Sequence, residues 1–314
     1  MVKDLYAPKY YGEFECIKGE CRNSCCIGWE IDIDDAAMKK YSHLCGDVGE
    51  RVRKSVFGFN NGGKNACGTD SSAHFVLTEG GRCPHLDECG LCRIITELGE
   101  EYLSDICRLH PRFFVDTKNG CEVGLGMSCE EACRIILSSD GYSEFIKIGE
   151  REGEICDFDV ADYRTEVYSI LSDRKMPYGE RLSRIAKTFS ASPGMLSDFE
   201  WRELIASLEY LDLRSASRFS RYSSDMADST WEIMLERALA YFVFRHVSGA
   251  KSYFEFRTGL VFALFCERLL ASVAHTEGII SESDFIMLAR RISEEIEYST
   301  DNTDAILAEI EFAL

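Results

Sequence analysis

Cysteine is the residue type in this chain whose number and placement could do chemistry. Thirteen of the fifteen cysteines lie at or before Cys133, and only Cys156 and Cys266 follow. Thiolates are soft ligands, and sets of four bind zinc or iron–sulfur clusters. Disulfides do not persist in a reducing compartment, so clustered cysteines in a cytoplasmic chain indicate metal. We therefore expect a cysteine-ligated metal domain in the N-terminal part, with an iron–sulfur cluster favoured over zinc.

The spacing of the cysteines defines two groups. The first places four thiols within eleven residues, at Cys16, Cys21, Cys25 and Cys26. The second comprises Cys83, Cys89 and Cys92, followed by Cys107 and Cys129. Neighbouring side chains on an extended backbone point to opposite sides, so the pair Cys25-Cys26 fits the separated irons of a cuboidal cluster better than one zinc ion. Alternatively, one of the pair ligates the metal and the other packs.

Other cysteines and motifs limit the alternatives. Cys45, Cys156 and Cys266 are expected to be small buried hydrophobes. The sequence contains no G-x-G-x-x-G after a strand, no His-Glu-x-x-His and no G-x-S-x-G. Cys21 and Cys25 begin a C-x3-C-x2-C triad, but position 28 is Gly28. Rossmann, zincin, hydrolase and radical S-adenosylmethionine chemistry are therefore not indicated.

Short elements are expected between the cysteines. Alternation over residues 29–34 predicts a strand, and Asp34 or Asp35 would cap a helix that runs through Tyr41. Residues 113–125, with Asn119-Gly120 at the turn, predict a β-hairpin. Residues 128–131 form a capping-box pattern at the start of a helix that runs through Ile136.

The second part of the sequence is different, because nearly all of its patterning is helical. Helical periodicity covers residues 160–171, 179–189, 196–211, 231–247, 259–274, 283–298 and 303–312. The sequence therefore predicts a mainly α protein with two parts. Residues 1–145 would be a cysteine-rich α+β metal domain with short strands, and residues 146–314 an all-α helical domain.

Charge narrows the class of partner. The chain has 54 acidic and 35 basic residues, a net charge of −19. Such a field repels phosphate backbones and anionic lipids, so nucleic acid and membranes are not expected as partners. The apolar runs 231–247 and 259–274 contain charged residues and are expected to be buried core helices. No apolar signal segment follows Met1, so a cytoplasmic location is expected.

Two blocks of residues together resemble a known family. The first contains Cys16, Cys21, Cys25-Cys26 and Gly28-Trp29, with Ile31, Ile33 and Asp34 after them. The second contains Cys83-Pro84, Leu86, Gly90-Leu91-Cys92, residues 97–105 and Cys107, followed by Arg112 and Ser128-Cys129. Over residues 6–137 this pattern resembles the flagellin lysine-N-methylases of the FliB type. It is also similar to the broader cysteine-cluster proteins that chelate zinc or iron.

The resemblance implies an S-adenosylmethionine-dependent lysine N-methyltransferase with a cysteine-bound iron–sulfur cluster of the 4Fe-4S type, or with zinc as the alternative metal. The expected partner is flagellin or another lysine-bearing protein. The ligand candidates that it implies are Cys16, Cys21, Cys25, Cys26, Cys83, Cys92, Cys107 and Cys129. Eight candidates exceed the four that one cubane needs, so either two centres exist or half of the set is structural. Cys67, Cys89, Cys121 and Cys133 fall outside the pattern. The helical part is a possible platform for the protein substrate.

Lysine methylation needs a group that accepts the proton of the ammonium, and it benefits from aromatic faces. Candidates beside the cysteines are Tyr11, Asp32, Tyr102 and Asp105. Arg108 and Arg112 are candidates for binding the carboxylate of the methyl donor, or form salt bridges within this acidic protein. The alternative function from another class is a non-catalytic metal-binding or redox module that docks a partner protein.

Overall fold

The fold consists of two compact units, seen in a computed structural model that describes residues 1–59, 73–225 and 230–314. Unit 1 comprises Met1–Phe14 and Pro111–Leu314, and unit 2 comprises Glu15–His110. Unit 2 is therefore inserted into unit 1, between its first strand and the rest of the chain. Cys67 lies outside the described residues.

Unit 2 contains short elements around a small core. Its helices and strands are α1 (Asp35–Ser42), α2 (Gly46–Ser55), β2 (Val56–Phe57), β3 (His74–Phe75), α3 (Arg93–Leu98) and α4 (Asp105–Leu109), with 3-10 turns at Lys18–Glu20, Glu79–Gly81 and Glu100–Tyr102. β2 and β3 pair antiparallel. The core includes Ile31, Ile33, Tyr41 and Phe75, which are all buried.

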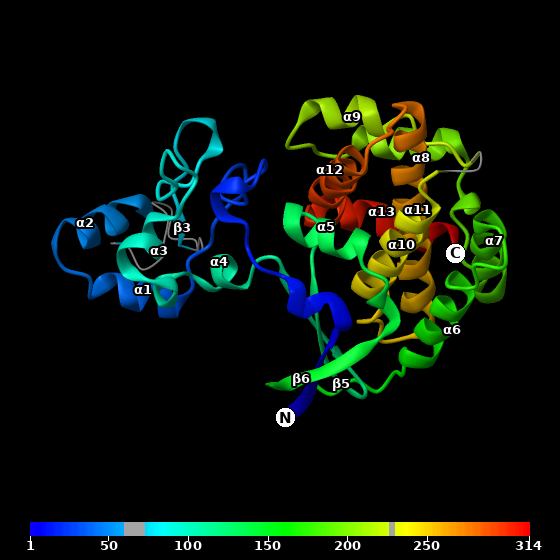
Figure 1. Cartoon of the computed structure of the whole chain (residues 1–314), viewed down its shortest axis with the longest axis horizontal. Helices are drawn as coiled ribbons and strands as arrows, with labels where there is room; N and C mark the ends of the chain where they lie inside the picture. Colours follow the sequence, from blue (N-terminus) through cyan, green and yellow to red (C-terminus); the bar gives the residue numbers. More distant parts are fainter. Residues whose placement is uncertain (60–72, 226–229) are drawn as a thin grey trace. The chain divides into compact units, whose positions relative to one another are not determined.

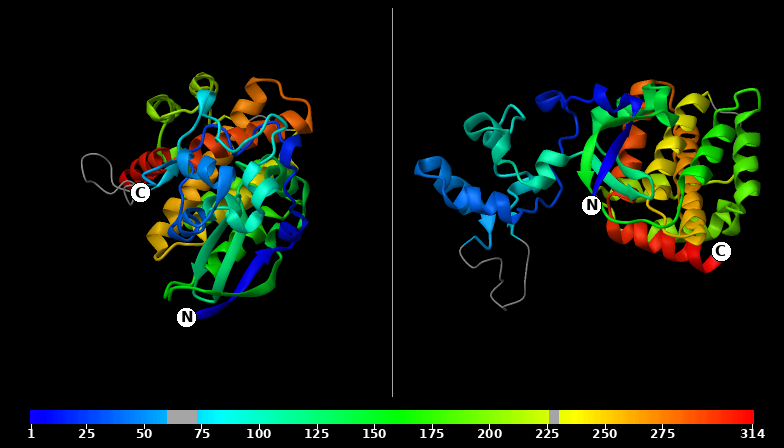
Figure 2. Two further views of the ribbon diagram at one scale, coloured as in Figure 1. Left: turned by 90° about the vertical axis from the view of Figure 1, so that its left-hand side faces the viewer. Right: turned by 90° about the horizontal axis from the view of Figure 1, so that it is seen from below.

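Unit 1 is built on a four-stranded sheet in the order β4-β5-β1-β6. The strands are β1 (Val2–Pro8), β4 (Arg112–Thr117), β5 (Gly120–Leu125) and β6 (Phe145–Glu152). β1 is parallel to β5 and antiparallel to β6, and β4 and β5 form the expected hairpin, in which Phe113 pairs with Gly124. The rings of Phe113 and Phe145 each lie 5.1 Å from Phe244, so the sheet packs on the helices of its own unit (Figures 1 and 2).

The helices of unit 1 confirm most of the expected helical segments. They are α5 (Glu130–Ser138), α6 (Ala161–Leu171), α7 (Tyr178–Phe189), α8 (Asp198–Ser207), α9 (Leu213–Phe219), α10 (Glu232–Val247), α11 (Tyr253–Thr276), α12 (Glu282–Ile292) and α13 (Thr300–Ala313), with 3-10 turns at Lys9–Glu13, Gly141–Ser143 and Pro193–Met195. A π-helical turn, η7 (Ser293–Glu297), extends α12. The mainly α class is confirmed.

The boundary expected between residues 145 and 146 differs from the division in the structure. β6 begins at Phe145 and pairs along its length with β1, so both sides of that boundary belong to unit 1. The second part is consequently not all-α. The reason is that β1 finds its two partner strands more than a hundred residues away, and local periodicity does not report such pairing.

Two local expectations are wrong and one is right. Residues 29–34 form no strand and contribute only an isolated bridge between Asp32 and His74. The helix after Ser128 begins with Cys129 as its N-cap and has no side-chain cap, because the Ser128 hydroxyl is buried without a hydrogen-bond partner among the described residues. Asp34 does cap α1, since its carboxylate accepts a hydrogen bond from the Ala37 N–H at 2.9 Å.

The core of unit 1 is centred on α10 and α11, which lie side by side (Figure 1). Within the described residues, α11 is the one helix long and apolar enough to cross a membrane, and 89% of its apolar window is buried inside the fold. Phe262, Phe265 and Leu269 are fully buried there. The expectation that these two segments are core helices is thus confirmed.

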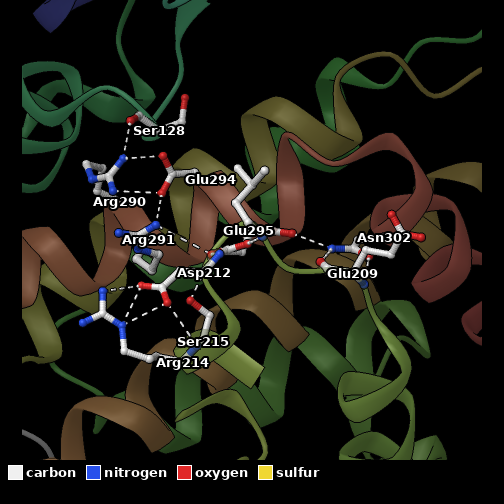
Figure 3. A network of polar contacts seen from close by, with 11 residues as sticks. Ser128, Glu209, Asp212, Arg214, Ser215, Arg290, Arg291, Glu294, Glu295 and Asn302 are labelled. Carbon is white, nitrogen blue, oxygen red and sulfur yellow. Dashed lines mark hydrogen bonds and ion pairs between the residues drawn. The ribbon is translucent and has the colours of Figure 1, made fainter. Parts of the chain in front are cut away.

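The π turn η7 directs three neighbouring glutamates toward different partners, as Figure 3 shows for two of them. Glu294 accepts from Arg290 at 2.9 Å and from Arg291 at 2.6 Å. Glu295 accepts from the backbone N–H of Leu211 at 2.8 Å and from the Ser215 hydroxyl at 3.0 Å. A π turn changes the angle between successive side chains, so that neighbouring glutamates can point toward different partners.

The close approach of α10 and α11 depends on Gly259. A Cβ at this position would overlap the backbone carbonyl oxygen of His246, which cannot move without shifting the helix. We expect Gly259→Ala to lower the free energy of unfolding by about 1–3 kcal/mol, because over-packing strains a tight interface. Gly179 on α7 has no neighbour within 4 Å of such a Cβ. Gly179→Ala should instead stabilise by about 0.5–1 kcal/mol in urea denaturation. Equal effects of the two changes would contradict this packing.

A buried carboxyl makes stability depend on pH. Glu267 is fully buried; one oxygen accepts from the Tyr178 hydroxyl at 3.0 Å, and the other has no partner among the described residues. Burial raises the pKa of Glu267 from 4.5 to about 7. Because the folded pKa lies above the unfolded one, the contribution to stability is fully present below pH 4.5 and is lost as pH rises through 7.

Glu267→Gln should flatten this dependence, since glutamine can accept the same hydrogen bond without ionising. We compare the free energy of unfolding of the variant with that of the wild type at each pH. From pH 5 to pH 8 this difference should shift in favour of the variant by up to roughly 3 kcal/mol. Urea denaturation at both pH values measures the effect. Glu166→Gln, at an exposed position on α6, provides the control. A difference that does not change with pH would show that Glu267 keeps an ordinary pKa.

Candidate metal centre

Four of the predicted ligands come together in unit 2. Cys26, Cys83, Cys92 and Cys107 are all buried or half-buried and belong to the same small core. They come from four separate segments, of which Cys92 is the N-cap of α3 and Cys107 lies within α4. The sequence groups of cysteines are therefore not the structural group, which takes one member from the first and three from the second.

Backbone hydrogen bonds between two loops hold Cys26 and Cys83 together. The Cys83 N–H donates to the Cys26 carbonyl at 2.8 Å, and the Gly28 N–H donates to the Gly81 carbonyl at 2.9 Å. Gly28 and Gly81 have φ values of 83° and 69°, in the left-handed region that glycine adopts without strain. The glycines thus allow the two cysteine loops to run side by side.

A tight turn and a helix N-terminus position Cys92. The Asp87 carboxylate accepts from the backbone N–H groups of Cys89 at 2.9 Å and Leu91 at 2.8 Å. This turn carries the chain directly into α3. At its start, the backbone N–H groups of Ile94 and Ile95 donate to the Cys92 sulfur and lower its pKa against the larger effect of burial. Such donors stabilise the thiolate form that binds metal.

Each of the other thiols also has a hydrogen-bond donor, from the backbone at Cys83 and from side chains at Cys107 and Cys26. The Cys83 sulfur accepts from the His85 backbone N–H. The Ser104 hydroxyl is buried and has no other partner among the described residues. As a hydrogen-bond donor to the Cys107 sulfur, it lowers the pKa of that thiol. Cys26 is the most acidic of the four: hydrogen bonds from Cys25 and Ser24 and the charge of Arg82 lower its pKa to about 7, against burial.

Electrostatics shows that the four thiols are neighbours. Burial is the main cause that raises the pKa of Cys83 to about 12 and that of Cys107 to about 11, and it also raises the pKa of Cys92. Repulsion between thiolates adds to this rise in every one of the six pairings of the four cysteines. Four half-buried thiolates cannot coexist without a cation, so the protein alone keeps most of them protonated.

This donor set fits a soft metal centre. Four thiolates are what one zinc ion or one cubane cluster requires, and a bound metal deprotonates its cysteine ligands. Within residues 1–59, 73–225 and 230–314, however, no three or more His, Cys, Asp or Glu side chains are already converged on a metal position. The thiols therefore share one neighbourhood without converging on a metal position in this structure.

The other four predicted ligands lie outside this set. Cys16 and Cys25 are exposed, and Cys21 is half-buried, with its thiol donating to the Asn23 carbonyl at 3.2 Å. Of the adjacent pair, Cys26 is the member that has Cys83, Cys92 and Cys107 as neighbours. Cys25 forms a hydrogen bond with Cys26. Cys129 belongs to unit 1, where it packs against the large core.

The remaining cysteines divide by burial. Cys266 and Cys133 are fully buried in unit 1, and the expectation for Cys266 is confirmed. Cys156 is half-buried, and its thiol donates to the Asp116 carbonyl at 3.3 Å. Cys45 is exposed at the N-cap of α2, so the expectation that it is buried is wrong. Its position in the sequence did not reveal that a helix would begin there.

Two of the candidates for catalysis or cofactor binding, Asp105 and Arg108, form an ion pair within unit 2. Asp105 accepts from Arg108 at 2.6 Å, and both side chains are exposed. Asp32 is also exposed. Tyr102 lines a hollow of about 460 Å³ together with Lys39, Lys40 and His43 of α1.

The other pair lies in unit 1. The Tyr11 hydroxyl accepts from Arg112 Nε at 3.0 Å, and the Arg112 guanidinium also lies 5.3 Å from the Phe14 ring. The structure thus joins each arginine candidate to one proton-acceptor candidate, but in different units. Sequence reasoning missed Ser24, Arg82 and Ser104. Adjacency to cysteine was the available signal for Ser24 and Arg82, and Ser104 lies in the block 97–105 of the resemblance.

Comparison with known proteins gives relatives for part of the chain. No protein-family model matches, and no solved structure matches. Over 134 residues, 42% of the chain, it is 30% identical to the lysine-N-methylases of Salmonella typhimurium and Salmonella choleraesuis, and it covers 32% of each. Over 146 residues it is 28% identical to the flagellar biosynthetic protein FliU of Salmonella muenchen, of which it covers 82%.

The chain thus matches about a third of the length of the curated methylases. The resemblance seen in the cysteine blocks is confirmed by proteins of that name. We conclude that the chain is related to the flagellin lysine-N-methylase (FliB) family.

Proposed function

We propose that this protein transfers a methyl group from S-adenosylmethionine to lysine side chains of flagellin. The observation that carries the proposal is the similarity to lysine-N-methylases over 134 residues. A cytoplasmic location is part of the same proposal.

We also propose that Cys26, Cys83, Cys92 and Cys107 hold a 4Fe-4S cluster in unit 2. Support comes from the mutual electrostatic effect of the four thiols and from the hydrogen-bond donors at each sulfur. A bound cluster would supply a redox-active centre, and zinc in the same set would supply a structural or Lewis-acid centre. The chain's own groups pre-orient the ligands: Ser24 and Cys25 stabilise the Cys26 thiolate, and the α3 N-terminus stabilises that of Cys92.

A second function is favoured by one specific observation. The chain covers only 32% of each lysine-N-methylase, so the shared part is consistent with a metal-binding or redox module that docks a partner protein without catalysing methylation. In that case the unit would bind metal, but methyl transfer would be absent.

Incubation of the anaerobically purified chain with S-adenosylmethionine labelled in its methyl group and with flagellin monomer separates the two functions. Label on flagellin lysines, located by mass spectrometry, supports the methyltransferase. A metal-loaded protein that transfers no label, while still binding flagellin in a pull-down, supports the docking module. Flagellin with acetylated lysines is the control for label in other positions.

A further inference from the structure

A fully buried carboxylate, Glu297, connects three side chains of α10 in unit 1. His246 Nε2 lies 2.7 Å from Glu297 Oε1, and Arg245 Nε lies 3.4 Å from the same oxygen. The Tyr241 hydroxyl donates to Glu297 Oε2 at 3.3 Å. The Tyr298 hydroxyl accepts from Arg245 Nη1 at 3.3 Å. A carboxylate, an imidazole, a guanidinium and two phenol hydroxyls are therefore in contact with one another in the core of unit 1.

The π turn makes this meeting possible. Glu297 is the last residue of η7, and Glu294 and Glu295 of the same turn face other partners. Glu297 has no exposed side-chain area, and the Arg245 guanidinium offsets its charge. π turns occur frequently at functional sites, because they redirect a side chain that a regular helix would place elsewhere.

The contacts fix both the orientation and the tautomer of His246. The ring packs at 4.5 Å from Phe262, and the carboxylate beside Nε2 holds a proton on that nitrogen. The lone pair of the neutral ring is then on Nδ1. Nδ1 forms no hydrogen bond with the described residues, and the His246 side chain as a whole is 13% exposed.

His85 offers an internal contrast. Its Nε2 lies 2.8 Å from the Ser55 hydroxyl, and its Nδ1 is buried without a partner among the described residues. His85 is thus only 1% exposed, whereas the His246 side chain is 13% exposed. Of these two histidines held in a core, His246 is the one with side-chain area open to solvent.

Burial keeps the His246 ring neutral near pH 7. Burial is the main cause that lowers its pKa; Glu297 raises it, and Arg245 lowers it again. Tyr241 and Tyr298 also face Glu297 or Arg245, and the buried thiols of Cys133 and Cys266 lie within the field of Glu297. A neutral imidazole with a carboxylate behind it is the arrangement of a general base.

We propose that His246, oriented by Glu297, accepts the proton that a substrate lysine must lose before methylation. This inference rests on the proposed function. An N–H bond of the ammonium breaks, a bond between that proton and His246 Nδ1 forms, and the electron pair stays on the amine nitrogen, where it can attack the methyl group. Glu297 stabilises the imidazolium, which then releases its proton to water. The nearby Arg245 cation lowers the pKa of the incoming ammonium and thereby favours the transfer.

The first test reads the base directly and needs no methyl transfer. Diethyl pyrocarbonate acylates unprotonated, accessible imidazole nitrogens, and mass spectrometry maps the modified histidines on the intact chain. We expect modification of His246 and none of His85, with a rate at His246 that falls as the pH is lowered. An unmodified His246 in the folded protein would overturn the inference, whatever the activity.

The second test replaces the base while keeping its hydrogen bond. His246→Gln can still donate to Glu297, but it cannot accept a proton, so we expect labelled-methyl transfer to fall by about 100-fold or more. Because burial lowers the pKa of His246, wild-type activity should fall only when the pH drops below the ordinary histidine range, and the variant should lose that limb. His275→Gln, at an exposed position on α11, should leave both rate and profile unchanged. Circular dichroism and the thermal midpoint check that the variant is folded.

The outcomes separate this inference from the proposed function. An active wild type with an equally active His246→Gln variant overturns the role of His246 and leaves the methyltransferase standing. An inactive wild type refutes the proposed function and, with it, the role of His246 toward lysine, even where the ring reacts with the reagent. Loss of rate without any change in the pH profile would reduce His246 to a positioning residue and would also contradict the proposal.

Discussion

Replacing any one of Cys26, Cys83, Cys92 and Cys107 with serine is expected to lower the metal content per chain by roughly tenfold or more, because an oxygen ligand weakens a soft-metal bond and one missing ligand labilises the whole site. The four thiols are neighbours in every pairing, so each should be equally needed. Iron, sulfide and zinc analysis after anaerobic purification, together with the optical spectrum, measures the effect. A brown wild-type protein identifies an iron–sulfur cluster.

Two controls match these substitutions. Cys45→Ser changes an exposed thiol of the same unit, and Cys266→Ala changes a fully buried thiol of the other unit. Both should keep the metal, although Cys266→Ala should cost some stability. Metal that survives all four single substitutions would show that other thiols hold the centre, with Cys16, Cys21 and Cys25 of unit 2 the next to be replaced. A colourless wild type with one zinc per chain would remove the iron–sulfur proposal and leave the four-thiol site.

A second large effect is expected from Arg181 in the core of unit 1. Its guanidinium donates to Glu236 Oε2 at 2.6 Å and to the Leu171 carbonyl at 2.6 Å, and both charged side chains are almost fully buried. Arg181→Met would leave the Glu236 carboxylate without its buried partner. Breaking a buried pair from one side costs about 3–5 kcal/mol, because the remaining charge stays desolvated.

Arg174 provides the matched control, because it contacts the same carboxylate from the surface. It lies 3.0 Å from Glu236 Oε1, but 48% of its side chain is exposed. Arg174→Met should therefore cost no more than about 1 kcal/mol. Urea denaturation followed by circular dichroism compares the two variants with the wild type. Similar losses for both would show that burial does not set the strength of this ion pair.

Two elements of the fold were predicted from local signals alone. The helix that runs through Tyr41 was expected from an acidic cap before an amphipathic run, and Asp34 does cap it. The hairpin over residues 113–125 followed from Asn119-Gly120 between apolar runs. Each of these depends on interactions within a few residues of chain, which composition and spacing report directly.

The candidate metal centre was predicted only in part. Residue type and spacing indicated thiolate chemistry, but they grouped Cys25 with Cys26 and included Cys129. Which thiols are neighbours depends on how the loop at Gly28 pairs with the loop at Gly81, and this is a long-range contact. Spacing along the chain cannot report such contacts, because loops of the same length can close in many ways.

What the sequence by itself determined is the chemistry that the chain offers: soft thiolate ligands crowded into its first part, an acidic surface, and helices with enough apolar surface to form a core. What only the tertiary structure decided is which of those groups meet. The insertion of unit 2 after Phe14, the return of β6 to β1, and the contact of Glu297 with His246 all join residues far apart in sequence. The physical reason is that burial and long-range pairing select these contacts, and both depend on the whole fold rather than on any one segment.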